Sequence, residues 1–106
     1  MRTNWFHVLV AIAAEDRHGS AIARDVLEQT EGGLRLWPAT LYRTLDDMVE
    51  AGLIVECSGE ERPARERGRR RFYGITPAGK AELSAAVNRM ATLADLGRRR
   101  LGDAAS

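Results

Sequence analysis

The segment from Trp37 to Thr76 constrains the fold of this chain more than any other stretch of its sequence. It begins WPATLYRTLDDMVEAGLIVE, where Pro38 suits the first position of a helix because its missing N–H needs no partner there. Gly52 supplies a stop, so residues 38–51 are predicted to form a helix. Its core-facing side is predicted from three apolar residues at helical spacing: Leu41, Leu45 and Met48.

Two short strands and an arginine-rich loop follow this helix. Leu53–Cys57 and Arg71–Ile75 are predicted to pair as a hairpin, with Tyr73 and Ile75 on one face. We call residues 58–71 the wing. From residue 60 to residue 71 the chain has six arginines and three glutamates, a local excess of three positive charges against a net charge of +1 overall. The placement of these arginines beside the helix indicates an anionic partner.

Two helices are expected before this segment. The first is predicted over Asn4–Glu15, with Thr3 or Asn4 as its N-cap. Because it is apolar on most sides, it must be covered on most sides, which is a first indication of a dimer. The second is predicted to begin at Ser20 as N-cap and to end at Gly32–Gly33.

A short strand and a long helix complete the expected order. The alternation of Leu34–Leu36 predicts a small strand. Thr76 as N-cap and Pro77 after it predict a helix that continues to about Arg100. This helix carries apolar or small residues at the alternating spacing of a coiled-coil seam: Leu83, Val87, Met90, Ala94, Gly97 and Leu101. It folds back onto its own domain, pairs with a second copy of the chain, or does both.

The order of these elements predicts a mainly α fold with a small β-hairpin. It is the order of a winged helix-turn-helix with one helix added at each end. We expect residues 1–76 to form a DNA-binding domain that includes the N-terminal helix 4–15. Residues 77–101 are expected to form a C-terminal dimerisation helix, and residues 102–106 a disordered tail.

The helix over 38–51 is predicted to enter the DNA major groove with its N-terminal half. Short residues allow close approach to base edges, and Arg43 can donate two hydrogen bonds to guanine. The alternative is a solvated helix in which Arg43 pairs with Asp47. Tyr42 either packs beside Val49 or presents its hydroxyl to a phosphate. The candidate DNA-binding residues are Ser20, Ala39, Thr40, Tyr42, Arg43, Thr44, Arg67, Arg69, Arg70 and Arg71.

The same sequence gives little support to an enzyme, a metal protein or a membrane protein. His7 and His18 have no nucleophile or carboxylate at a spacing that indicates a catalytic site, and with Cys57 they lie too far apart to predict a metal site. We expect neither a catalytic residue nor a cofactor. A single cysteine suits a reducing cytoplasm, and no apolar run is long enough to span a bilayer.

The sequence resembles the PadR family of bacterial transcriptional regulators, specifically the small subgroup with a single C-terminal helix. The likeness covers about residues 3–96. Three runs carry it most specifically: Pro38-Ala39-Thr40-Leu41-Tyr42, Glu50-Ala51-Gly52-Leu53-Ile54 and GRRRFYGITPAGKAEL. The resemblance implies a homodimeric repressor that binds an inverted-repeat operator in double-stranded DNA through helix 38–51 and the wing.

The resemblance also implies that the first and last helices form the dimer interface, and that a small hydrophobic effector binds there in some members. The expected interface residues are Trp5, Phe6, Leu9, Leu83, Val87, Met90, Leu93 and Ala94. Trp5 and Met90 are the candidate ligand contacts, although an aromatic stripe is more often packed core. The sequence departs from the family pattern at five positions: His18, Ser20, Trp37, Arg43 and Gly74. His18 and Ser20 remove two possible phosphate or packing contacts, and Trp37 stands where the family has a serine or threonine as the N-cap of the third helix.

An alternative function uses the same fold to dock another protein instead of DNA. The acidic end of helix 38–51, with Asp46, Asp47 and Glu50, fits this alternative better than it fits a phosphate backbone. Binding to duplex DNA from the promoter of its own gene separates the two functions.

Overall fold

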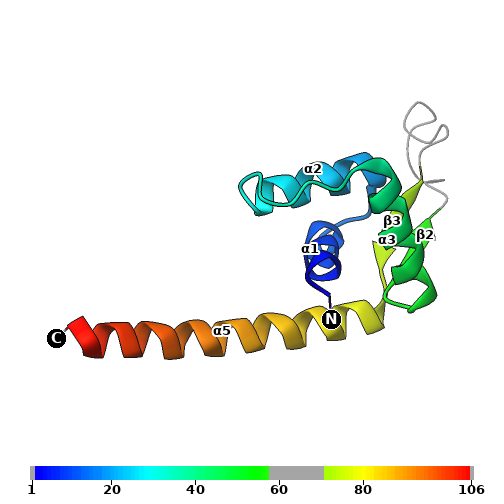
Figure 1. Cartoon of the computed structure of the whole chain (residues 1–106). Coiled ribbons are helices and arrows are strands. Elements are labelled where there is room, and N and C mark those ends of the chain that lie inside the picture. The colour runs from blue at the N-terminus through cyan, green and yellow to red at the C-terminus, as the bar shows by residue number, and fades with distance from the viewer. Residues whose placement is uncertain (1, 58–70, 106) are drawn as a thin grey trace.

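The computed structural model describes residues 2–57 and 71–105 of the 106-residue chain (Figure 1). The fold is mainly helical with a small antiparallel sheet, as predicted. The elements follow the order α1 (Thr3–Ile12), β1 (Arg17–His18), α2 (Gly19–Gln29), α3 (Pro38–Glu50), β2 (Ile54–Cys57), β3 (Phe72–Ile75) and α5 (Pro77–Ala105).

The predicted hairpin is confirmed, but the third strand of the sheet is not where the sequence placed it. β3 lies in the middle and pairs antiparallel with β2 and with β1. The alternating run Leu34–Leu36 forms no strand, because Leu36 is buried in the core and Leu34 packs against it from an irregular loop. Arg17 and His18 pair instead with Tyr73 and Phe72.

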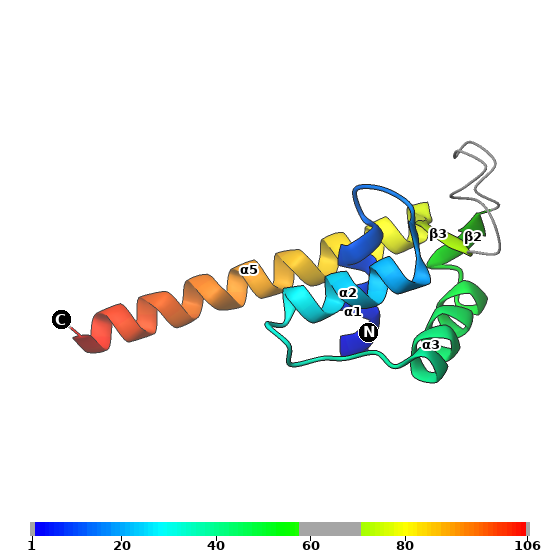
Figure 2. The ribbon, with the colours of Figure 1, turned by 90° about the horizontal axis from the view of Figure 1, so that it is seen from above.

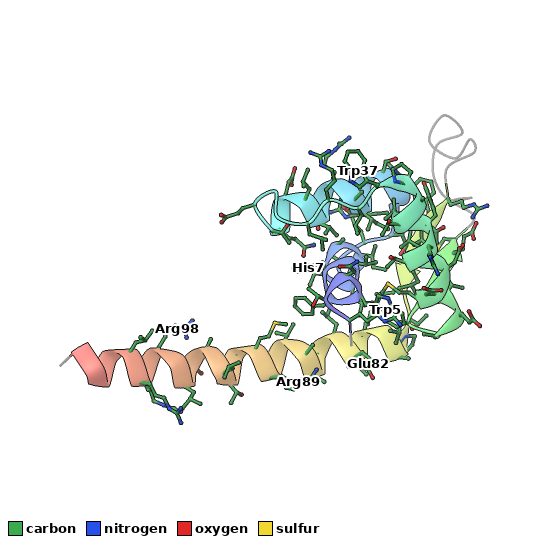
Figure 3. The ribbon with its side chains drawn as sticks, viewed as in Figure 1. Trp5, His7, Trp37, Glu82, Arg89 and Arg98 are labelled. Atoms are coloured by element: carbon green, nitrogen blue, oxygen red, sulfur yellow. The ribbon has the colours of Figure 1, made fainter. Side chains whose placement is uncertain are left out.

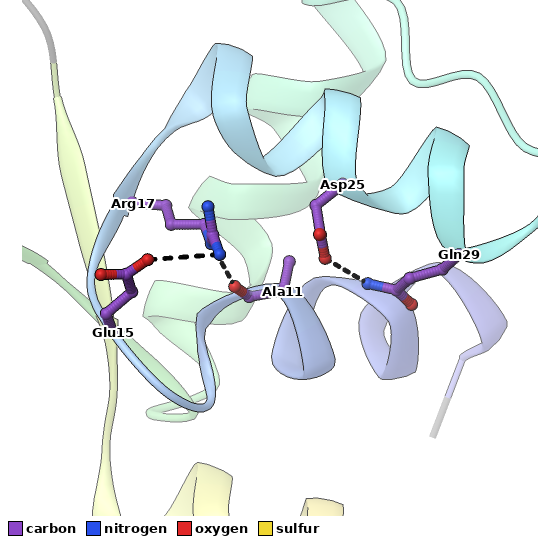
Figure 4. Close-up of polar contacts among 5 residues, drawn as sticks. All are labelled: Ala11, Glu15, Arg17, Asp25 and Gln29. Carbon is purple, nitrogen blue, oxygen red and sulfur yellow. Dashed lines mark hydrogen bonds and ion pairs between the residues drawn. The ribbon is translucent and has the colours of Figure 1, made fainter.

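The first helix differs from its predicted bounds at both ends. Its N-cap is Arg2, which makes no side-chain capping bond, so the prediction of Thr3 or Asn4 was wrong. α1 ends at Ile12 and not at Glu15. A cause is visible in Figure 4, where Arg17 Nε donates to the Ala11 carbonyl at 2.7 Å and takes an acceptor that a longer helix would use.

The second helix also starts and ends earlier than predicted. His18 and not Ser20 is its N-cap, since His18 Nδ1 accepts from the Ala21 amide at 3.2 Å. α2 ends at Gln29, and Gly32 then supplies a positive φ of 85° in the turn that follows. The helix-turn-helix therefore begins two residues nearer to β1 than expected.

The long helix begins as predicted and runs further than predicted. Thr76 Oγ1 accepts from the Gly79 amide at 3.0 Å and donates to the Gly52 carbonyl at 2.7 Å, so one hydroxyl caps α5 and joins it to the end of α3. α5 continues to Ala105, so residues 102–105 are helical where a disordered tail was expected. None of the helices described here is long and apolar enough to cross a membrane.

The core lies around α1, which the other elements surround. Figure 1 places α1 between α2 and α5, and Figure 2 shows α5 extending well beyond the rest of the domain. The core side chains come from every helix and from the sheet; the largest fully buried ones are Tyr73, Leu9, Ile12, Ile22, Leu45, Met48 and Ile54. Leu9 was predicted in a dimer interface, and that was wrong, because it is fully buried within its own domain.

Candidate nucleic-acid interface

The N-terminal half of α3 presents small and basic side chains to solvent. Ala39, Thr40 and Arg43 are exposed, while the three residues predicted to face the core are all buried. Thr44 is only 8% exposed, so its expected place on the outer face was wrong. It lies next to Leu45 and one turn from the other core-facing residues, which puts its side chain on the inner edge of the helix.

Arg43 makes no ion pair with Asp47 or with any other described residue. The alternative of a self-paired, solvated helix is therefore not what the structure contains. Further along α3, Asp46 and Glu50 are exposed and Asp47 is half-buried, so the C-terminal half is acidic. The charge of α3 thus changes sign along its length, and only its first turns suit an anionic partner.

Tyr42 joins the two helices of the helix-turn-helix. It is half-buried, packs against the core and lies directly under Gly19 at the start of α2. A Cβ atom on Gly19 would approach the Tyr42 hydroxyl oxygen to 2.6 Å, so the glycine permits this close approach. Ser20, beside it, is exposed. Tyr42 therefore packs on α2. Neither of the two predictions, packing beside Val49 or presenting the hydroxyl to a phosphate, included this contact with α2.

The loop before α3 contains two residues, Arg35 and Trp37, that were not among the candidate binding residues. Trp37 is the N-cap of α3, makes no side-chain capping bond and is 64% exposed. The Arg35 guanidinium lies 5.1 Å from the centre of its ring. Figure 3 shows Trp37 on the side of the domain away from α5. An arginine two residues before an aromatic N-cap was the pattern in the sequence that could have revealed this pair.

Arg71 is the one wing residue that the structure describes, and it lies beside the sheet. Arg67, Arg69 and Arg70 lie outside the described residues, whereas Arg71 directly precedes β3 and is exposed. Arg71 Nε is 3.8 Å from Glu56 Oε1 on β2, and both side chains are about half exposed, at 56% and 50%.

Tyr73 lies two residues further along the chain and opposite Glu56 in the sheet. Its side chain is fully buried, and its hydroxyl has no hydrogen-bond partner of acceptable geometry among residues 2–57 and 71–105. Burial raises the pKa of the Tyr73 phenol, and Arg71 opposes that rise. The pKa of Arg71 is raised in turn, first by the Tyr73 side chain and next by the Glu56 carboxylate.

The middle of α5 carries an apolar surface that its own domain does not cover. Ala86 is buried against α1 and Leu83 packs on the core, but Val87, Met90 and Leu93 are 45%, 51% and 67% exposed. Ala94 is exposed and Phe6 on α1 is half-buried. Of the eight predicted interface residues, all except Leu9 therefore keep some exposed surface in the single chain.

A groove of about 280 Å³ lies between α1 and α5. It is lined by Thr3, Phe6, His7, Ala86, Arg89 and Met90. Met90 is where the prediction placed a ligand contact, but Trp5 does not line the groove and packs instead against the core.

His7 connects this groove to α2. Its Nδ1 lies 2.8 Å from Gln29 Oε1, and Gln29 Nε2 donates both to the His7 carbonyl at 3.0 Å and to Asp25 at 2.8 Å. Figure 4 shows the bond between Asp25 and Gln29. In the part of the chain that the structure describes, no three His, Cys, Asp or Glu side chains come together as a metal site.

The sequence profile of the transcriptional regulator PadR-like family matches residues 8–85. The chain belongs to this family. It is a transcriptional regulator of the PadR type, as the resemblance indicated, and the match includes α2, α3, the wing and residues 77–85 of α5.

Three relatives illustrate how this PadR-like regulator compares with other chains. It is 36% identical over 78 residues to a transcriptional regulator of Mycobacterium tuberculosis, covering 74% of this chain and 66% of the relative. It is 28% identical over 89 residues to a protein of Lysinibacillus sphaericus, covering 84% and 79%. It is 38% identical over 95 residues to a transposon protein of Streptomyces fradiae, covering 88% and 25%. The chain thus spans a quarter of the Streptomyces protein and just under two thirds of the Mycobacterium one.

Solved structures share the fold of the PadR-like regulator. A PadR family transcription regulator from Clostridium difficile superposes with a TM-score of 0.75 at 21% identity, covering 94% of this chain and 99% of the other. RosR from H. salinarum superposes with a TM-score of 0.69 at 21% identity, covering 99% and 94%. The winged helix-turn-helix with added terminal helices is therefore the fold of this chain.

Proposed function

We propose that this protein is a homodimeric repressor that binds an inverted-repeat operator in the bacterial cytoplasm. The observation that carries the proposal is the first half of α3, where Ala39, Thr40 and Arg43 are exposed and the opposite side is buried. Small residues let a helix approach base edges, and an unpaired arginine is free to donate to guanine. The wing arginines would contact phosphates on either side of the groove.

The dimer is the second part of the proposal. α5 leaves Val87, Met90 and Leu93 exposed on a helix that projects from the domain. Exposed apolar residues along one side of a helix are commonly covered by a partner, and a two-fold pair of α5 helices would cover them. Such a pair would hold two copies of α3 at one fixed separation, which an operator with two half-sites requires.

Arg43→Ala is expected to weaken operator binding by about 1–3 kcal/mol and to relax the preference for one base pair in each half-site. Fluorescence anisotropy with a labelled duplex from the promoter of its own gene measures the loss, and a set of single base changes measures the preference. Arg98→Ala is the matched control, because Arg98 lies far along α5 and pairs with Asp95. Equal effects of the two variants would contradict the role of Arg43.

Arg69→Ala combined with Arg70→Ala is expected to weaken binding to all duplexes equally. If each arginine neutralises one phosphate, the two subunits of the dimer together lose four contacts, and the slope of log affinity against log salt falls by about four. Salt titrations of wild type and the double variant measure this slope. An unchanged slope would exclude these two residues as phosphate contacts.

A small aromatic or drug-like effector would bind in the groove between α1 and α5 and thereby relieve repression. Phe6 and Met90 supply its apolar walls, and His7 links it through Gln29 to α2. Anilinonaphthalene sulfonate, added to the wild-type protein, is expected to increase in fluorescence and to lower operator affinity. In Met90→Ala the same dye should bind several-fold more weakly, and unchanged dye affinity would place the site elsewhere.

The second candidate function is a protein-docking module, which the acidic C-terminal half of α3 favours. It predicts no salt-dependent binding to any duplex. Wild-type protein that fails to bind promoter DNA at low salt would favour it over the repressor.

A further inference from the structure

Tyr73 carries a hydroxyl group that its packing does not explain. The side chain is completely buried, and the hydroxyl makes no hydrogen bond with any part of the chain that the structure describes. A buried polar group without a partner lowers stability, and phenylalanine would fill the same space without that cost. Such a hydroxyl is therefore expected to have a role beyond holding the fold together.

The charged groups around this hydroxyl come from three elements. Arg71 precedes β3 and lies on the same side of the strand as Tyr73, because side chains two residues apart share a face. Glu56 on β2 is the cross-strand neighbour of Tyr73. The carboxylate of Asp46 on α3 acts electrostatically on both Tyr73 and Arg71. The hydroxyl thus lies where α3 meets the base of the wing.

Arg71 is only loosely held in this arrangement. Its Nε is 3.8 Å from Glu56 Oε1, which is too long for a hydrogen bond, and the two side chains are half exposed. An exposed ion pair of this kind contributes little to stability. The planar guanidinium has five N–H donors, so it can bind the Tyr73 hydroxyl and a phosphate at the same time.

We propose that the Tyr73 hydroxyl is a positioning group that holds Arg71 toward a phosphate of the bound DNA, and that Glu56 is the counter-ion that Arg71 leaves on binding. The inference rests on the proposed DNA-binding function. When DNA binds, the phosphate replaces the Glu56 carboxylate, and the Arg71 guanidinium, which in the free protein lies near the buried hydroxyl without a hydrogen bond of acceptable geometry, donates to it. Tyr73 and Glu56 therefore act in opposite directions on the same arginine.

The test compares the variants Tyr73→Phe and Glu56→Gln in the full-length chain. Each variant is made in the wild-type background and in the Arg71→Ala background. Tyr73→Phe is expected to weaken duplex binding about three- to tenfold, the loss of one charge-assisted hydrogen bond, while its melting temperature stays equal or rises. Glu56→Gln is expected to strengthen binding about two- to fivefold, because the competing carboxylate is removed. Anisotropy titrations and thermal unfolding measure both quantities.

The Arg71→Ala background separates this role from a structural one. Arg71→Ala alone should lower the salt slope by about two, one for each subunit of the dimer, and in its presence Tyr73→Phe and Glu56→Gln should leave affinity unchanged within about twofold. Glu50→Gln on α3 is the matched charge control and should strengthen binding less than Glu56→Gln does.

Three results would overturn the inference while leaving the proposed function intact. Tyr73→Phe could bind DNA as tightly as wild type, it could bind more weakly only in proportion to lost stability, or its effect could persist in the Arg71→Ala background. Wild-type protein that binds no duplex at low salt would remove the proposed function and this inference together.

Discussion

Leu93→Asp is expected to convert the protein to a monomer and to reduce operator affinity on the order of a hundredfold. Leu93 is 67% exposed in the single chain, so a carboxylate there is solvated and the domain keeps its fold. In the proposed dimer the same carboxylate would be buried without a partner, which costs several kcal/mol per subunit, on the order of the penalty for an unpaired buried charge. Loss of the second half-site contact then accounts for the large fall in affinity.

Sedimentation or light scattering measures the oligomeric state of this variant, and anisotropy measures its DNA binding. Thr92→Asp is the matched control, because it adds the same charge one residue away, where helical geometry points the side chain to another side of α5. It should remain a dimer. If Leu93→Asp stays dimeric, or becomes monomeric without loss of operator affinity, the proposed role of α5 is wrong.

Gly79→Ala is expected to destabilise the domain by about 3 kcal/mol, the upper end of the usual range for overpacking. An alanine inside a helix normally adds stability, by about 1 kcal/mol relative to glycine. Here the added methyl group would clash with the Leu53 carbonyl oxygen and come within 2.8 Å of Ile75 Cγ1. The carbonyl cannot move away freely, because it accepts the Thr76 amide at 3.1 Å.

Chemical denaturation measures this loss, and the same variant should lower the melting temperature by more than about 10 °C. Gly97→Ala is the control, since among the described residues nothing outside the neighbouring backbone of α5 lies within 4 Å of a Cβ atom there. It should leave stability unchanged or raise it. Gly79→Ala with stability equal to that of Gly97→Ala would mean that α5 can shift on the sheet at little cost.

Helix and strand positions with strong local chemistry were predictable from the sequence. Pro38 fixed the start of α3, and the Thr76-Pro77 pair fixed the start of α5 to the residue. The spacing of Leu41, Leu45 and Met48 identified the buried side of α3. In these places a residue acts on its own backbone or on its neighbours one turn away, so no distant part of the chain enters the prediction.

Errors arose where a side chain takes a hydrogen-bonding role that its residue type does not indicate, or where a distant segment decides the outcome. α1 ends early where Arg17 takes the Ala11 carbonyl, and His18 caps α2 although Ser20 is the better capping residue by type. The run Leu34–Leu36 has the alternation of a strand, but in the described sheet the strands that pair with β3 are β1 and β2. Hydrogen bonds in a sheet need two partners, and the sequence of one segment says nothing about the position of the other.

The candidate site likewise contains residues that the sequence could assign and residues that it could not. Arg43, Ala39 and Thr40 could be assigned from helical spacing alone, because their exposure follows from the position of the core-facing residues. The burial of Thr44 could not be assigned in this way. Thr44 lies between the buried and the exposed sides of α3, and whether such a residue is covered depends on how deeply the helix packs. Trp5 and Leu9 were apolar residues on a helix that is apolar nearly all round, and only packing decides which side faces the core.

By itself the sequence determined the order of the helices and of the hairpin, the family, and which side of α3 is exposed. These depend on local conformational preferences and on periodicity, which each segment carries within itself. Only the tertiary structure brought Tyr73, Glu56 and Arg71 together under α3, and only it assigned Leu9 to the core and Leu93 to the surface. Contacts between segments far apart in the chain are set by the packing of the whole domain, because each element is placed by all of its neighbours at once.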